Sequence, residues 1–247
     1  MSDSTPKKEN PLLNVLLNII IPTVILIKFS GPEDLGPQLG IIVALAFPIT
    51  YGVFDFFRAR KINFFSALGV VSIFLTGGIT LLGLDPKYIA IKEAAIPALF
   101  GIATLVSLRT RYPLVKTFLF NDNIMQTDRV HDALEAKGNE SAFERCLTIA
   151  SYMIAGSFCV SSILNYALAK WVLVSPPGTE EFNAELGRMT ALSLPVITIP
   201  AMIILVGALY YLFKQITRLT GLSLEDIFIE HEESNKDKNE KNNEQES

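Results

Sequence analysis

The sequence predicts an all-α polytopic membrane protein with six transmembrane helices and both termini in the cytoplasm. Of its 247 residues, 50% are hydrophobic and only 19% are charged. A bilayer core about 30 Å thick requires roughly 20 apolar helical residues to cross it, and in lipid only a helix satisfies its own backbone groups. The apolar residues form runs of that length instead of being spread along the chain. These runs are Pro11–Phe29, Gln38–Phe57, Phe64–Gly83, Ile89–Leu108, Cys146–Val174 and Thr190–Phe213.

Charge and cysteine content exclude several other classes of protein. A net charge of −4 argues against a basic nucleic-acid binder, so we expect no nucleic-acid partner. Two cysteines are too few for a disulfide scaffold. We expect both of them, Cys146 and Cys159, to be buried thiols, because free cysteines usually pack in the interior.

The orientation follows from the basic residues beside the runs. Loops on one side carry few of them: Gly31–Gly36, Leu84–Lys87 and Ser175–Arg188 are acidic or sparse. Cytoplasmic loops carry an excess of lysine and arginine, so the more basic side is predicted to be the cytoplasm. The residues that define this side are Lys7, Lys8, Arg58, Arg60, Lys61, Arg109, Arg111, Lys116, Arg129, Lys137, Arg145, Lys214 and Arg218.

The remaining segments are polar. Residues 1–10 and 230–247 are expected to be disordered cytoplasmic tails, since they hold too few apolar groups to offset ordering. The insert at 120–145 is expected to hold an amphipathic helix over Asp128–Lys137, capped by Thr127 and ended by Gly138. The predicted order is therefore a tail at 1–10, spans 1–4 within 11–119, the insert at 120–145, spans 5 and 6 within 146–213, a juxtamembrane segment at 214–229, and a tail at 230–247. Within the juxtamembrane segment, the weak amphipathic pattern of Leu222–Ile229 is expected to rest on the inner leaflet.

Two adjacent charges lie inside the fourth run. Lys92 and Glu93 are placed about one turn below the outer surface, where ionisable groups are costly. Adjacent helical residues point about 100° apart, so we expect them not to pair with each other. Lys28 and Lys170 lie at the same expected depth, which makes a Glu93–Lys28 or Glu93–Lys170 pair our hypothesis. The alternative is that the side chains extend to the lipid headgroups.

A second polar cluster is expected at the cytoplasmic end. Asn14 and Asn18 are spaced four residues apart and share one helix face. Asp55 and Arg58 are three residues apart at the inner end of the second run. The alternative to a functional site is ordinary hydrogen bonding between membrane helices.

Small residues predict close packing of the third and fourth helices. Gly77, Gly78, Ala98 and Gly101 offer surfaces on which helices approach closely, and packing explains them without a ligand.

Prolines interrupt runs in both halves of the chain, as broken helices do in some transporter sites, although proline is common in membrane helices generally. They are Pro22, Pro48, Pro97, Pro195 and Pro200.

Recognisable catalytic motifs are missing from the sequence. It contains no Walker loop, HExxH, CxxC or GxSxG pattern. Its two histidines, His131 and His231, lie in polar segments and make a weak case for a metal site. We therefore predict a protein that is not an enzyme and carries no catalytic residue, metal or cofactor.

Residues of the third and fourth runs resemble the bacterial intracellular septation protein A family, small inner-membrane proteins linked to cell division and envelope upkeep. The resemblance covers about a quarter of the chain. Glu93, Pro97 and the length beyond Phe120 depart from the family pattern, which indicates a distant or extended relative. The residues that carry it are Gly77-Gly78, Thr80, Leu81, Lys92, Ala98-Leu99-Phe100, Val106-Ser107 and Pro113-Leu114.

The resemblance implies a place in the bacterial inner membrane and a broad role. We predict a non-enzymatic interaction or scaffold protein in cell division or envelope maintenance. Its expected partners are the lipid bilayer and membrane proteins of division or the envelope, with homo-oligomerisation left open. The alternative is a small-solute or ion transporter that uses the proline-broken helices.

Overall fold

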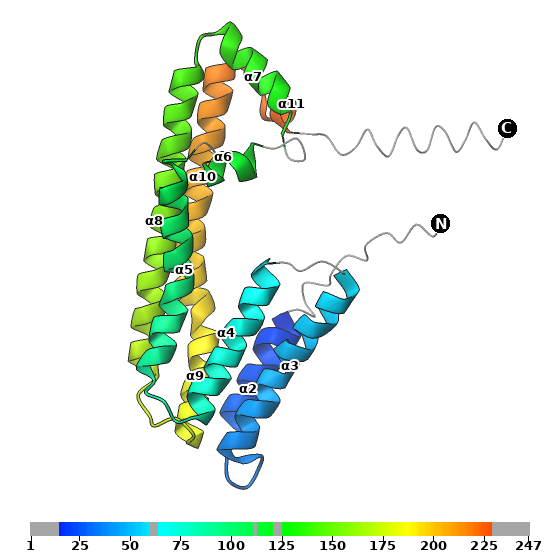
Figure 1. Cartoon of the computed structure of the whole chain (residues 1–247), viewed down its shortest axis with the longest axis vertical. Helices are drawn as coiled ribbons and strands as arrows, with labels where there is room; N and C mark the ends of the chain where they lie inside the picture. Colours follow the sequence, from blue (N-terminus) through cyan, green and yellow to red (C-terminus); the bar gives the residue numbers. More distant parts are fainter. Residues whose placement is uncertain (1–14, 60–63, 111–112, 121–124, 229–247) are drawn as a thin grey trace, which may run out of the picture. The chain divides into compact units, whose positions relative to one another are not determined.

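A computed structural model describes residues 15–59, 64–110, 113–120 and 125–228, apart from the side chains of residues 55–59, 64–67 and 119 (Figure 1). These parts of the chain are helical, and their one extended pairing is an isolated bridge between Met125 and Phe228. The elements are η1 (Leu16–Ile20), α2 (Ile21–Lys28), α3 (Gly36–Ala59), α4 (Phe64–Leu81), α5 (Lys87–Ser107), α6 (Leu114–Leu119), α7 (Thr127–Ala136), α8 (Glu140–Val172), α9 (Glu180–Ser193), η2 (Leu194–Thr198), α10 (Ile199–Thr220) and α11 (Leu224–Ile227).

The predicted all-α class is confirmed. In the described residues, four helical stretches are long and apolar enough to cross a membrane: Gly36–Phe54, Lys87–Ser107, Glu140–Val172 and Glu180–Thr220. Two shorter apolar helices, Leu16–Lys28 and Leu68–Leu81, lie where the first and third spans are expected. These helices indicate a membrane protein. The number of six spans stays a prediction.

The prediction of an outer loop over Ser175–Arg188 is wrong over most of that range, because helix α9 begins at Glu180. Thr179 caps α9 by accepting a hydrogen bond from the backbone of Phe182, and Glu180 and Glu181 occupy the first turn. Acidic side chains are favourable at this end of a helix. From Glu180 the helix continues through η2 and α10 to Thr220, over 41 residues. The polarity that indicated a loop belongs instead to a capped helix start.

The chain divides into two compact units. Unit 1 consists of Met1–Ala98 and Cys159–Ala201, and unit 2 of Leu99–Phe158 and Met202–Ser247. Helices α5, α8 and α10 contribute residues to both units.

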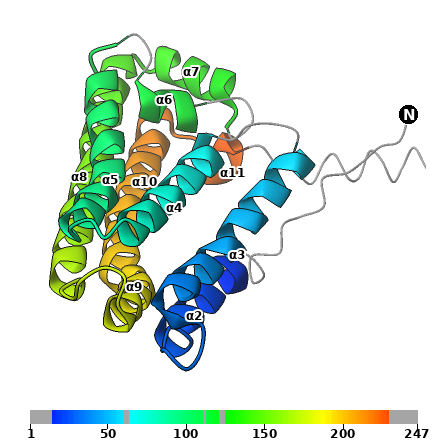
Figure 2. The same ribbon diagram turned by 60° about the horizontal axis from the view of Figure 1, so that its bottom comes forward.

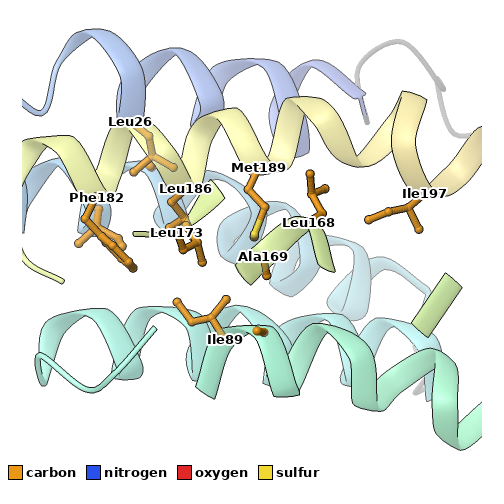
Figure 3. Packing of buried hydrophobic residues seen from close by; sticks show 12 residues of the cluster. Leu26, Ile89, Leu168, Ala169, Leu173, Phe182, Leu186, Met189 and Ile197 are labelled. Atoms are coloured by element: carbon orange, nitrogen blue, oxygen red, sulfur yellow. The ribbon is translucent and has the colours of Figure 1, made fainter. Parts of the chain in front are cut away.

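Unit 1 packs α2 against both α3 and α9, and α3 against α4. Phe182 is completely buried in its core beside Leu26 and Leu186 (Figure 3). Close approach of α9 to α2 depends on Gly187, because a Cβ there would lie 2.9 Å from Ile27 Cγ1 and 3.2 Å from the Thr23 carbonyl oxygen. This core therefore needs a small residue at position 187.

A buried polar contact ties α9 to the turn between α2 and α3. Asn183 has 0% exposure, and its Nδ2 donates to Ser30 Oγ at 3.1 Å and to the Pro37 carbonyl at 2.7 Å. Ser30 is itself buried against Gly40, where any Cβ would come within 2.5 Å of the Ser30 hydroxyl. The turn is thus held by one side chain from a distant part of the sequence.

Unit 2 confirms the helix expected in the insert. Val130 and Leu134 of α7 are buried with Phe143 and Leu147 of α8. Gly138 ends α7 with φ +62, as predicted. The expected N-cap is wrong by one residue: Gln126 precedes the helix without a side-chain cap, and Thr127 is the first helical residue.

The juxtamembrane segment joins the same core, and its expected contact with the inner leaflet stays a prediction. Ile227 of α11 is fully buried in the unit 2 cluster, and α11 lies beside α7 (Figure 2). Asp226 forms a capping box with Ser223 and an ion pair of 2.8 Å with Arg129. Hydrogen bonds from Ser223, assisted by the Arg129 charge, lower the pKa of Asp226 below its usual 3.8.

The two cysteines differ from each other. Cys146 is buried, as expected, whereas Cys159 is exposed. Helix α8 is apolar around much of its circumference, so its composition does not reveal which face packs inward.

Candidate functional site

A cavity of about 410 Å³ lies inside unit 1, with walls from η1, α2, α3, α4, α5 and α9. Most of its wall is apolar, including Leu26, Leu45 and Met189. The polar side chains that line it are Asn18, Tyr51, Ser72, Thr76, Lys92, Glu93 and Thr190.

Lys92 is the most fully engaged of these groups. Its ammonium donates to Ser72 Oγ at 2.9 Å and to Thr76 Oγ1 at 2.8 Å, both on α4. It also forms an ion pair with Glu93, with Nζ and Oε1 2.7 Å apart. Three ammonium hydrogens therefore have three close partners, which is how a largely buried charge is compensated.

The expectation that Lys92 and Glu93 do not pair is wrong. The angle of about 100° describes where the bonds leave the helix, and the long lysine and glutamate side chains span it by bending toward each other. Ser72 and Thr76 reinforce this geometry because residues four apart share one face of α4.

The hypothesised partners of Glu93 are wrong as well. Lys28 and Lys170 are both exposed, near the ends of α2 and α8. The ion pair of Glu93 is with Lys92. Lys92 does not extend to the headgroups either, because its ammonium is held by α4 side chains.

The second predicted cluster is only partly described. Asn18 lies in η1 and lines the cavity. Asn14 lies outside the described residues, and so do the side chains of Asp55 and Arg58, whose backbone belongs to α3. Their proximity to one another stays a prediction.

Prolines near the cavity do not break their helices. Pro48 and Pro97 lie inside α3 and α5, which continue through them. Pro22 follows the π-helical turn η1, and Pro195 lies within the π-helical turn η2. Proline has no backbone N–H, and single π-helical turns are frequent at functional sites. The predicted interruptions are therefore continuous α-helix at Pro48 and Pro97 and widened turns at Pro195 and just before Pro22. Pro200 is the second residue of α10, and Pro22 and Pro48 line the cavity.

Of the predicted packing glycines, Gly77 lies against α3 rather than α5. A Cβ on Gly77 would be 2.9 Å from Leu45 Cδ1, whereas one on Gly78 would meet nothing within 4 Å. In α5, Ala98 is half-buried and Gly101 is buried. Polar contacts of Lys92 link α5 to Ser72 and Thr76 of α4.

The sequence analysis missed Ser72 and Thr76. Their signal is two hydroxyl side chains at a four-residue spacing in an otherwise apolar run, facing a lysine from the next helix. Their hydroxyls hold the Lys92 ammonium in place.

Ser72 and Lys92 have the spacing of a serine–lysine catalytic dyad, with Oγ and Nζ 2.9 Å apart. A lysine serves as a base in such a dyad only when it is uncharged. Lys92 Nζ is also 2.7 Å from Glu93 Oε1 and 2.8 Å from Thr76 Oγ1, so the same nitrogen takes part in an ion pair and a second hydrogen bond. The arrangement suits binding better than nucleophilic chemistry.

Outside the cavity, α7 carries one cluster of metal-ligand type. Donor atoms of His131, Asp132 and Glu135 lie within 4.8 Å of one another, and all three side chains are exposed. Exposed clusters of this kind are common without an ion. The cluster alone does not indicate a metal site.

Comparison of the chain with known protein families, with curated proteins and with solved structures returned no match. The class of protein therefore rests on the fold and the site: an all-helical membrane protein with a charged pair inside a mostly apolar cavity. The resemblance to septation protein A stays a prediction.

Proposed function

We propose that this protein binds and transports a small solute by means of the unit 1 cavity. The observation that carries the proposal is the Lys92–Glu93 pair, which places two charges in the wall of a cavity lined largely by apolar side chains. Ionisable residues within membrane-spanning segments are costly, and they characteristically mark substrate or ion pathways. The adjacent widened turn η1 and the prolines of α2 and α3 support the same function.

The proposed setting is the bacterial inner membrane, with six spans and both termini in the cytoplasm. The distribution of basic residues supports this orientation. The apolar helices Leu16–Lys28 and Leu68–Leu81 support a first and a third span in addition to the four longer ones. An inner-membrane location is supported by the family resemblance. The alternative function, an interaction role in cell division, depends on that resemblance alone. It requires partner proteins and makes no use of the cavity.

Accessibility of the cavity to water tests this function. Thr190 lines the cavity and is the test position. Ile203 on α10, which is 67% exposed, is the control position. In a chain with Cys146 and Cys159 replaced by alanine, we expect Thr190→Cys to react with a charged, membrane-impermeant thiol reagent from at least one side of the membrane. Ile203→Cys should stay unreactive, because a thiol surrounded by lipid does not ionise.

Intact cells and inverted membrane vesicles distinguish the two sides. Failure of Thr190→Cys to react in either preparation would show that water does not reach the cavity and would contradict transport through it. Denatured samples of both variants must react fully, which shows that each thiol is intact.

A further inference from the structure

The two charges of the cavity are not equally available to a ligand. Lys92 has a side chain only 9% exposed, and its ammonium is occupied by Ser72, Thr76 and Glu93. Glu93 has a side chain 28% exposed, and its ion pair with Lys92 uses one carboxylate oxygen, Oε1. A carboxylate has about four acceptor positions. The charge that the cavity offers to an incoming molecule is therefore negative.

The remaining polar walls do not change that sign. Asn18, Tyr51 and Thr190 line the cavity and contribute an amide, a phenol and a hydroxyl group. Among the described lining residues, Lys92 is the one positive charge, and its donors are in use. An anion would have to displace at least one acceptor of Lys92 and would lie beside the Glu93 carboxylate, whereas a cation finds an accessible carboxylate.

Size and wall chemistry narrow the class further. A cavity of about 410 Å³ is far larger than a bare metal ion requires and falls in the range of small-molecule sites. Leu26, Leu45 and Met189 provide an apolar surface for an organic body. Tyr51 adds an aromatic ring, which is favourable beside a cation.

We propose, on the premise that unit 1 transports a small solute, that the solute is an organic cation: a protonated amine or amidine with an apolar body. Its charged group pairs with Glu93 and competes there with Lys92. In the empty cavity Lys92 is a tethered counter-ion, because a buried carboxylate without a partner would be costly. When the cation binds, the Lys92 ammonium keeps its bonds to Ser72 and Thr76 and gives up Glu93.

Competition predicts opposite effects for substitution of the two charged residues. Lys92→Gln removes the competitor and should tighten cation binding, since Glu93 no longer has an internal partner. Glu93→Gln removes the acceptor and should abolish the preference for a cation. A cavity that recognises an anion through Lys92 would show the reverse for Lys92→Gln.

Three probes with the same ring separate charge from shape: benzamidinium, which is cationic, benzamide, which is neutral, and benzoate, which is anionic. We expect the full chain in detergent micelles, measured by titration calorimetry, to bind benzamidinium about tenfold or more tightly than the other two, because a hydrogen bond to a charged group contributes that much. Lys92→Gln should strengthen benzamidinium binding by a similar factor. Glu93→Gln should bring it to the level of benzamide, and Glu93→Asp should keep the cation preference.

The inference and the proposed function fail in different ways. Preference for benzoate, equal binding of benzamide and benzamidinium, no binding of any probe, or weaker benzamidinium binding by Lys92→Gln would each overturn the cation class. If Thr190→Cys still reacts with the impermeant reagent in those cases, the transport proposal stands. Glu93→Gln is informative because it preserves shape, and its melting temperature and Thr190→Cys labelling show whether it has folded.

Discussion

Phe182→Ala should destabilise unit 1 by about 3 kcal/mol or more, because removing a fully buried ring leaves a cavity that its neighbours fill only partly. Phe182 has 0% exposure and lies in the cluster that joins α9 to α2, α3, α5 and α8. Helices in lipid gain little from hydrophobic exclusion, so the loss consists mainly of van der Waals contacts. Circular dichroism during titration with a denaturing detergent measures the free energy of unfolding.

Phe74→Ala is the matched control for this substitution. Phe74 lies on α4 and is 61% exposed, so its removal should change the free energy by no more than about 0.5 kcal/mol. Equal effects of the two substitutions would show that α9 does not pack as described.

Asn183→Asp should also be strongly destabilising, by about 3 kcal/mol or more at neutral pH, because it buries a charge without a partner. It replaces the amide that donates to Ser30 Oγ and to the Pro37 carbonyl with an acceptor. The new carboxylate would then face the Pro37 oxygen with no hydrogen to share. The same detergent titration measures this effect, and proteolysis of the turn between α2 and α3 should become faster.

Asn139→Asp provides the comparison for this second prediction. Asn139 is half-buried immediately before α8 and donates to the Leu219 carbonyl. An aspartate at the start of a helix is favourable, so the loss of one hydrogen bond should be largely offset. If Asn183→Asp lowered the free energy of unfolding no more than Asn139→Asp, Asn183 would not hold the turn.

The helical class could be predicted from the sequence because length and apolarity act over whole runs. The start of α9 could not, because acidic residues after Thr179 are typical both of a polar loop and of a capped first turn. Gly138 was predictable because a backbone with positive φ favours glycine at that one position. The exposure of Cys159 was not, because a cysteine within an apolar run gives no sign of the face on which it lies.

The candidate site was predictable in its charges and not in its contacts. Lys92 and Glu93 stand out in any apolar run, yet their pairing depends on how two long side chains bend and on which helix lies opposite. The hydroxyls of Ser72 and Thr76 decide that geometry. The cavity follows from the packing of several helices, which no local pattern specifies.

A charge on Glu93 is costly, and therefore informative, only if lipid surrounds unit 1. The number of membrane spans tests this condition most directly. Alkaline phosphatase, which is active only outside the cytoplasm, can be inserted after Asp34 and after Pro86, and green fluorescent protein fused after Ser247. Six spans predict phosphatase activity at both Asp34 and Pro86 and fluorescence at Ser247. Activity at Asp34 alone would mean that Leu68–Leu81 does not cross the membrane, and activity at Pro86 alone would mean that Leu16–Lys28 does not. A dark fusion at Ser247 would place the C-terminus outside the cytoplasm and contradict the predicted topology.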